Sequence, residues 1–422
     1  MHVFIAALLA ATSCAGIARA NALPPAAAGQ PFTLDRALAL AGAASPTVDS
    51  ADAGVRVAGA ARVIAGRRPN PTIEAQAENI AGSGPYRGTY SSETTVSLAL
   101  PIELGGKRAA RIATAEARGS RARIEAAILL ADLRLEIMRA YNGAAAAERR
   151  LAVADEQARI AAEGLNVAET RVAAGAASPI ERQRAVVVKL NAAAALEGTR
   201  RTAGVLRSNL ARLIGQPVIG ALDLAWFDRT ANDYGPVEPV GTEGTLALAA
   251  AAAELAVAEA GVRQARTMRV PDLTLSAGAR RLAASNDMAA VVGLSLPIPL
   301  FDGGSAAVGQ ATAERDQADA RRRIAAIAAG QAIALAVVER ANAATRARMA
   351  GGPALEAARE AARIARIGYA QGKFGQIELL EAERTLSETR AAAIDALAAW
   401  HDTDAQLIRL TTPAPAFGGE IR

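Results

Sequence analysis

Aromatic side chains are scarce in this 422-residue chain: they make up 3% of the residues, although 51% are hydrophobic. Much of the apolar content is alanine, which favours helix and lets helices approach closely but buries little area per residue. This composition argues against a thick globular core and favours long, closely packed helices. Because 21% of the residues are charged and the hydrophobic pattern is periodic, general disorder is not expected either.

Cysteine and histidine are almost absent. Cys14 is the only cysteine, so a disulfide framework is excluded, and His2 and His401 are the only histidines. His401 has no second histidine at metal-ligand spacing, and we predict that it is a packing or surface residue. Gly105-Gly106-Lys107 lacks the rest of a phosphate-binding loop. We therefore expect no catalytic residues, no bound metal and no cofactor, which means that the chain is not an enzyme.

Residues 1–20 resemble a secretory signal. Val3–Ala11 is apolar, and Ala18-Arg19-Ala20 has the small-x-small pattern of a cleavage site. The alternative is a lipoprotein signal that ends before Cys14, which would then carry the lipid. Export in either form excludes a cytosolic protein.

No later apolar run is long enough to predict a membrane helix. The most apolar candidate, Ile324–Val338, is short and is interrupted by Gln331. If the chain spans a membrane, we expect it to do so with strands, since only helices and closed barrels satisfy their backbone groups in lipid.

The excess of positive charge does not predict a nucleic-acid partner. The net charge is +5, but the arginines are spread among acidic residues rather than clustered. Few aromatic side chains are present on which bases could stack. We interpret the charges as the solvated faces of long helices.

The chain contains an internal repeat with a period of nearly 200 residues. Ser97–Ile102 matches Gly293–Ile298, and each is followed by a double glycine. Further along, Gly175 with Ile180-Glu181 matches Gly372 with Ile377-Glu378. Matches that keep nearly one offset over most of the chain indicate a duplicated architecture.

Each copy has the predicted order helix, strand, loop, strand, very long helix, tight turn, helix. The fold class is α+β. The first repeat is predicted over 33–225, with strands 72–78 and 93–100 and helices 106–170 and 179–215. A linker follows over 226–243. The second repeat is predicted over 244–412, with strands 272–280 and 288–296 and helices 304–370 and 376–411, and a tail follows over 413–422. The leading helix of the first repeat is expected over Thr33–Arg67. The double glycines and prolines mark predicted strand-to-helix turns at Pro101, Gly105, Gly106, Pro297, Gly303 and Gly304.

The four predicted strands alternate between apolar and polar residues, which gives each an apolar and a polar face. The apolar sets are Ile73, Ala75 and Ala77; Val96, Leu98 and Leu100; Leu273, Leu275, Ala277 and Ala279; and Ala290, Val292, Leu294 and Leu296. If these strands span a bilayer, four are too few to close a barrel. Protomers must then share one barrel: a dimer would give eight strands and a trimer twelve, and only the larger barrel leaves an obvious aqueous lumen.

The first long helix carries two opposed apolar stripes. It has no proline from Gly106 to Thr170 and would be roughly 100 Å long. The stripes are Ile124, Ile128, Ala131, Leu135 and Met138 on one side and Leu129, Leu133, Ile137 and Tyr141 on the other. Charged residues occupy both remaining flanks. This pattern is typical of a stave in a barrel wall, with a neighbour on each side.

The paired Leu-Pro-Ile segments with double glycines, and the paired glycine-containing tips followed by Ile-Glu, resemble the TolC family of outer-membrane factors. Within that family, Leu100–Arg108 looks most like the branch that serves cobalt–zinc–cadmium resistance pumps. The resemblance implies a homotrimer with a shared twelve-stranded β-barrel among outer-membrane lipid and a periplasmic α-barrel. It also implies passive export, with a periplasmic adaptor and an inner-membrane RND pump as partners.

The resemblance also implies roles for residues at the helical tips. Adaptor docking falls on Gly175, Ala176, Gly372 and Lys373. The lumen constriction falls on Tyr369, Glu378, Glu381 and Glu181, where repeated carboxylates attract cations. The chain departs from the family where Phe374 occupies the position of the gating arginine.

Two alternatives stay open at this stage. A duct of the same kind could export drugs or secreted proteins, since the lumen-facing residues do not separate these cargoes from divalent heavy-metal cations. A protein of another class, a soluble coiled-coil scaffold or adaptor of the envelope, would contain the long helices but has less need of four amphipathic strands.

Overall fold

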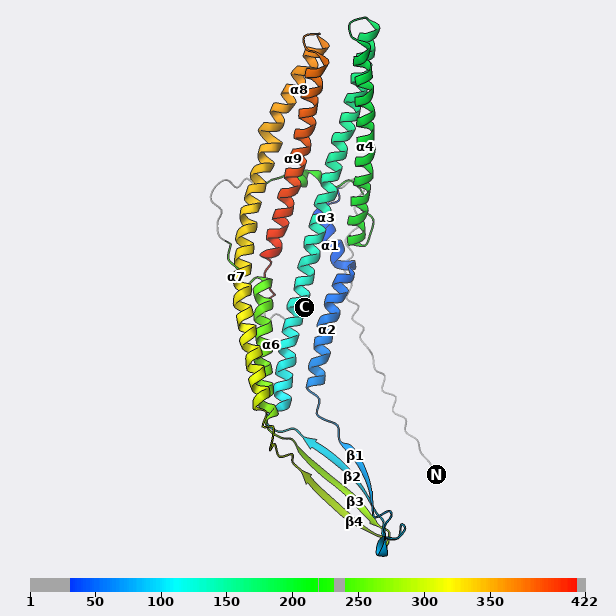
Figure 1. Ribbon diagram of the computed structural model, residues 1–422, viewed down its shortest axis with the longest axis vertical. Coiled ribbons are helices and arrows are strands. Elements are labelled where there is room, and N and C mark those ends of the chain that lie inside the picture. Colours follow the sequence, from blue (N-terminus) through cyan, green and yellow to red (C-terminus); the bar gives the residue numbers. More distant parts are fainter. Residues whose placement is uncertain (1–30, 219, 231–239, 416–422) are drawn as a thin grey trace, which may run out of the picture.

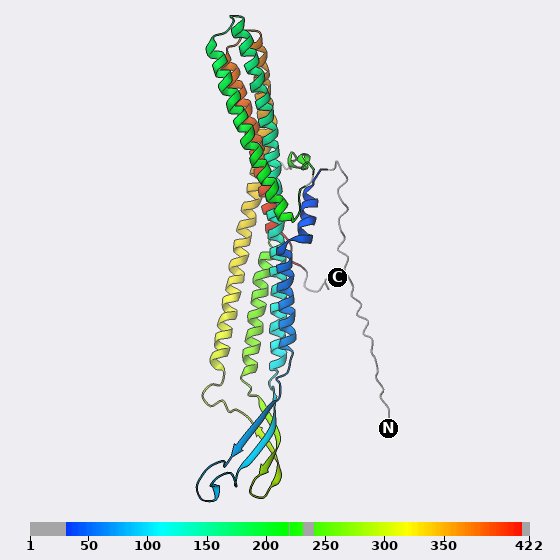
Figure 2. The ribbon, with the colours of Figure 1, turned by 90° about the vertical axis from the view of Figure 1, so that its right-hand side faces the viewer.

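The computed structural model describes residues 31–218, 220–230 and 240–415. The expected signal segment 1–20, including Cys14, lies outside the described residues, as do 231–239 of the linker and 416–422 of the tail. The described chain is a long rod with a sheet at one end and two helical hairpins at the other (Figures 1 and 2).

The elements follow the duplicated order. The first copy contains α1 (Leu34–Ala44), α2 (Pro46–Ala65), β1 (Thr72–Glu78), β2 (Glu93–Ile102), α3 (Lys107–Ala173), α4 (Pro179–Ile214) and the short α5 (Leu224–Phe227). The second contains α6 (Leu246–Met268), β3 (Leu273–Leu282), β4 (Asp287–Ser295), α7 (Ser305–Met349), α8 (Leu355–Ala370) and α9 (Gln376–Leu410).

Two helices that we expected to be single are broken. The leading helix ends at Ala44, because Pro46 lacks an N–H and Ser45 caps the next helix by accepting from the backbone N–H of Thr47. The helix expected over 304–370 is interrupted between α7 and α8 by a π-helical turn, Ala350–Ala354. Its sequence, Ala-Gly-Gly-Pro-Ala, contains Pro353, and Gly352 has non-helical dihedrals of φ −102° and ψ −107°.

The sheet has four antiparallel strands in the order β1-β2-β3-β4. Ile73 pairs with Leu98, Leu98 with Ala277, and Ala277 with Val292, so one register row joins the apolar residues of all four strands. These apolar side chains are exposed in the single chain, Val292 by 82%. The predicted alternation is thereby confirmed, and it leaves one whole face of the sheet apolar.

The opposite face of the sheet is polar and carries an ion-pair cluster. Arg280 contacts Glu78 at 3.0 Å and Glu93 at 2.7 Å, and its Nε donates to the Thr95 hydroxyl at 3.0 Å. Strands β2 and β3 extend past their predicted ends: β2 includes Ile102 and Pro101, which we predicted at a strand-to-helix turn, and β3 extends to Leu282. Pro101 is tolerated there because β1 begins at Thr72, opposite Ala99, so only β3 runs beside it.

Helix α3 lies between two sets of neighbours, α2 and α4 on one side and α6 and α9 on the other (Figure 1). Ile124 and Met138 of one predicted stripe and Leu133, Ile137 and Tyr141 of the other are buried, whereas Leu129 is exposed. The two-sided packing predicted for this helix is confirmed.

The largest buried cluster lies at mid-height, where α1, α3, α4, α5 and α9 meet. Tyr141 donates a hydrogen bond to the carbonyl of Phe32 at 2.7 Å and accepts one from the backbone N–H of Asp223 at 3.1 Å. Four aromatic residues, Phe32, Tyr141, Trp226 and Phe227, lie in or against this cluster and connect the short helices to the long ones.

One segment of the described part, Ser305–Ala370, contains an apolar stretch that meets the length and composition of a membrane span. Our expectation that no later segment qualifies is wrong by that measure. The physical reason is that alanine raises the mean hydropathy of this stretch while it adds little bulk.

Candidate functional site at the helical tips

The two hairpins α3/α4 and α8/α9 end in the same backbone motif. Gly175 and Gly372 have positive φ angles of 68° and 72°. In the first tip the N–H of Ala176 bonds to the carbonyl of Arg171 at 2.8 Å, and in the second the N–H of Lys373 bonds to that of Gly368 at 2.8 Å. These are Schellman motifs, which require a residue that tolerates the left-handed conformation. The four residues Gly175, Ala176, Gly372 and Lys373 are exposed at the apex.

The hairpins touch each other just below these turns. The Tyr369 hydroxyl lies 3.4 Å from Glu181 Oε2. Gln376 Nε2 donates to the carbonyl of Glu181 at 3.1 Å. The structure therefore brings together the predicted pair Tyr369 and Glu181 and adds an amide from the start of α9.

An arginine also joins this contact, from a position that the sequence did not indicate. Arg171 Nη1 donates to the carbonyl of Tyr369 at 3.1 Å, and its guanidinium carbon lies 4.7 Å from the centre of the tyrosine ring. Phe374, where the resemblance implied the position of a gating arginine, instead packs its ring against Gly368, where an added Cβ would be 2.1 Å from Phe374 Cδ2. The cation thus comes from the first hairpin rather than the second.

Only the repeat could have pointed to Arg171. The repeat offset of 197 places Arg171 opposite Gly368, so one tip has an arginine where the other has a glycine. Gly368 leaves room for Phe374, and Arg171 reaches across to Tyr369. No spacing rule predicts that crossing, because it depends on how the two hairpins are rotated.

Tyr369 is held as a neutral hydrogen-bond donor. Its side chain is buried, with 6% of its surface exposed. Burial, followed by the nearby negative charge of Glu181, raises the pKa of the Tyr369 phenol. The phenol therefore keeps its proton at neutral pH and can donate to the Glu181 carboxylate.

Glu378 and Glu381, the other predicted constriction residues, lie on the first turns of α9 and are exposed. Glu381 is 3.8 Å from Arg384 on the same helix. The structure does not bring them into contact with Tyr369 or Glu181. Within the described residues no group of three histidine, cysteine, aspartate or glutamate side chains has the geometry to hold a metal ion.

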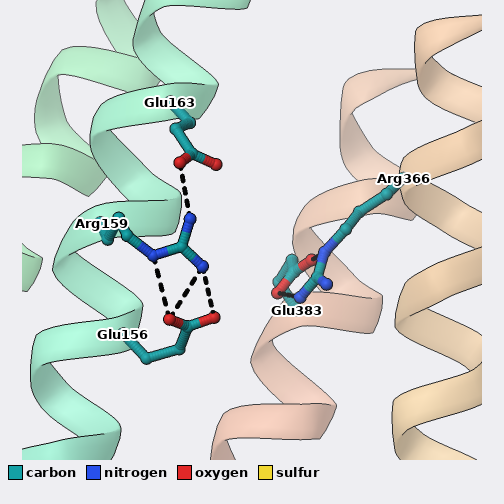
Figure 3. Close-up of polar contacts among 5 residues, drawn as sticks. All are labelled: Glu156, Arg159, Glu163, Arg366 and Glu383. Carbon is teal, nitrogen blue, oxygen red and sulfur yellow. Dashed lines mark hydrogen bonds and ion pairs between the residues drawn. The ribbon is translucent and has the colours of Figure 1, made fainter.

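Below the tip contacts, charged residues form pairs inside each hairpin (Figure 3). Arg159 binds Glu156 at 2.7 Å and Glu163 at 2.6 Å, all on α3. Arg366 of α8 forms a bidentate pair with Glu383 of α9. None of these three ion pairs bridges the two hairpins, so the ion pairs drawn in Figure 3 do not oppose their separation.

The strand-to-helix turns lie at the other end of the rod. Gly106 and Gly304 have positive φ angles of 76° and 72° and cap α3 and α7, and Gly105 also has a positive φ. Pro297 follows β4, and the carbonyl of Gly303 accepts a bond from Arg269 at 3.1 Å. Lys107, at the start of α3, is buried and pairs with Asp272 at 2.8 Å. This pair joins the two repeats beside the sheet.

His401 is a packing residue, as predicted. It lies buried at mid-height, stacked on Trp226 with ring centres 4.0 Å apart, and its Nε2 is 2.9 Å from the carbonyl of Phe227. Burial lowers the pKa of the imidazole despite the hydrogen bond to Phe227 and the nearby Asp404 and Asp402.

The family model for "Outer membrane efflux protein" matches residues 37–216 and 243–412. Over 394 residues the chain is 32% identical to the cobalt-zinc-cadmium resistance protein CzcC of Cupriavidus metallidurans, covering 90% of each protein. It is 32% identical over 305 residues to the nickel-cobalt-cadmium resistance protein NccC of Alcaligenes xylosoxydans xylosoxydans, covering 70% of this chain and 67% of that relative.

Solved structures share the fold. The outer membrane protein VceC of Vibrio cholerae superposes with a TM-score of 0.74 at 22% identity, over 90% of this chain and 96% of VceC. Channels of this family are trimers. The matched sequence family, the duplicated strands and the paired helical hairpins agree: this chain belongs to the TolC-type outer membrane efflux protein family, as a non-enzymatic channel of tripartite efflux in the bacterial outer membrane that extends into the periplasm.

Proposed function

We propose that this channel is the exit duct for divalent heavy-metal cations, driven by an inner-membrane RND pump through a periplasmic adaptor. The observation that carries the proposal is the 32% identity, over 90% of each protein, to a relative named for cobalt, zinc and cadmium resistance. The channel family is non-enzymatic, so the part of this chain in the proposed export is a passive path.

The assembly that we propose is a homotrimer. In the single chain β1 and β4 are edge strands with unpaired backbone groups, and hydrocarbon does not tolerate such edges. Three copies joined β4 to β1 would close a barrel of twelve strands. The apolar row of Ile73, Leu98, Ala277 and Val292 would face lipid, and the Arg280 cluster would face the lumen.

The gate that we propose is the contact between the hairpins. Arg171, Tyr369, Glu181 and Gln376 hold α8/α9 against α3/α4, and opening requires these bonds to break. Glu378 and Glu381 lie beside this contact, and three copies would concentrate six carboxylates there. Such a ring attracts divalent cations toward the narrow end.

The exposed turns at Gly175-Ala176 and Gly372-Lys373 are the proposed adaptor-docking surface. They are the extreme end of the rod, opposite the sheet (Figure 1). An adaptor that binds there would reach both hairpins of a protomer and could bias the gate.

Deletion of the gene and measurement of growth in zinc, cadmium, cobalt and antibiotics tests the cargo. We expect tolerance to one or more of the metals to fall, with antibiotic tolerance unchanged, and restoration by the plasmid-borne gene. Loss of antibiotic tolerance with normal metal tolerance would reject the metal cargo in favour of a drug duct.

A further inference from the structure

A cavity of about 310 Å³ lies between the two hairpins, below the tip contacts. All four helices α3, α4, α8 and α9 contribute to its lining. Its apolar walls include Ile160, Val167, Val188, Leu379 and Leu380. Cavities of this size with apolar walls and a few polar groups are the usual form of a small-molecule site.

The charged residues that line the cavity do not balance. Glu156, Glu163 and Glu383 contribute three carboxylates, and Arg159 and Arg366 contribute two guanidinium groups (Figure 3). Each arginine is already bound to a carboxylate of its own hairpin. The cavity therefore has one excess negative charge, which favours a cationic occupant over an anionic one.

Two glutamines of the lining each have one buried side-chain atom without a hydrogen-bond partner in the described part of the chain. Gln376 is 9% exposed. Its Nε2 donates a hydrogen bond to the Glu181 carbonyl, whereas its Oε1 has no partner in the described part of the chain. Gln157 Nε2 is also buried without a partner there. Buried polar atoms are normally paired, so these two lining residues keep an unused acceptor, Gln376 Oε1, and an unused donor, Gln157 Nε2.

We propose that this cavity binds a small amphiphilic ammonium compound. Its apolar body would lie against the leucine, isoleucine and valine walls, and its ammonium group would complement the excess carboxylate charge. A bare metal ion fits less well, because the walls are apolar and the carboxylates are engaged by arginine. The site lies in the wall between the hairpins and does not depend on the cargo proposed above.

The test is equilibrium binding to the purified full-length channel in lipid nanodiscs, measured by calorimetry with empty nanodiscs subtracted. The probes are 4-phenylbutylammonium, 4-phenylbutanol and 4-phenylbutanoate, which share one apolar body and differ in charge. We expect the ammonium compound to bind at least about tenfold more tightly than the alcohol and the carboxylate to bind most weakly. Equal affinity for ammonium and alcohol would overturn the proposal.

Variants locate the binding. Leu380→Trp fills the cavity and should abolish binding, whereas Leu190→Trp adds the same bulk to an exposed position of α4 outside the lining and should not. Retained binding by Leu380→Trp overturns the proposal.

Variants that change the charge of the cavity lining test the proposal even if the Leu380→Trp variant does not fold. Glu163 and Arg159 are both more than half exposed, so their replacement by glutamine should leave the fold intact. Glu163→Gln should weaken ammonium binding by about threefold or more, and Arg159→Gln should strengthen it. Unchanged affinity in both variants overturns the proposal.

Discussion

The guanidinium of Arg171 lies over the ring of Tyr369, 4.7 Å from its centre, and donates to that residue's carbonyl at 3.1 Å. One side chain of the first hairpin thus holds both the ring and the backbone of the second. The pairing places a cation at the contact between the hairpins.

We predict that Arg171→Ala opens the channel. It removes a hydrogen bond and a cation–π contact, each worth about 1 kcal/mol, so the open fraction should rise by roughly tenfold or more. Single-channel conductance in planar bilayers measures this. Arg182→Ala, an exposed arginine on α4, is the matched control and should behave as wild type.

A weaker effect is expected from Tyr369→Phe. The variant removes only the 3.4 Å bond to Glu181 and keeps the ring under Arg171. Its open fraction should lie between those of wild type and Arg171→Ala. A larger increase in open fraction for Tyr369→Phe than for Arg171→Ala would contradict the prediction that the Arg171 contacts hold the hairpins together more strongly than the Tyr369–Glu181 bond.

Glu378→Ala combined with Glu381→Ala should lower cation selectivity. Both carboxylates are exposed near the tip, and three protomers would lose six negative charges from the proposed constriction. Reversal potentials in a salt gradient report the selectivity. The control variant Glu388→Ala, farther along α9, should leave the cation selectivity unchanged. Unaltered selectivity in the double variant would contradict the proposed acidic constriction.

The kink between α7 and α8 should set the direction of the second hairpin. Gly352→Asp with Pro353→Glu introduces the residues found at the matching positions of the unbroken α3, Asp155 and Glu156. The helix should straighten, and the tips should separate because α8 no longer leans toward α3. Spin labels at Ala174→Cys and Gln371→Cys measure the tip distance by electron paramagnetic resonance.

Gly351→Ala serves as the control for that experiment. The non-helical dihedrals belong to Gly352, so Gly351→Ala should leave the tip distance unchanged and stabilise the helix by about 1 kcal/mol or less. If the Gly352 and Pro353 variant keeps the wild-type distance, the kink does not position the hairpin.

Stability should fall in mild acid because of His401. Burial lowers its pKa in the folded state below the ordinary value of 6.5, so the unfolded chain binds the proton more readily. The stabilisation is complete above about pH 6.5 and is lost as the pH falls from there toward the folded pKa. Thermal unfolding followed between pH 5 and 8 should show this slope, and His401→Phe should reduce it. An unchanged slope in that variant would assign the effect to other groups.

The sequence alone determined the duplicated order of elements, the two faces of the strands and the two-sided packing of α3. These features are local or periodic: apolar residues repeat every second or every third to fourth position, and each strand or helix must bury that side. Pro46 and Pro353 can also be read in the sequence. The helix breaks at these two prolines were nevertheless not predicted, because the helical period of apolar residues continues across both prolines.

Only the tertiary structure decided which residues meet across the hairpins. Arg171, Tyr369, Glu181 and Gln376 come from separate helices, and their contact depends on the rotation and tilt of one hairpin against the other. The same holds for the cavity lined by Gln157 and Gln376, whose unpaired atoms have no sequence signature. Periodicity fixes the side of a helix that is buried, whereas the partner of each side chain follows from the packing of whole helices.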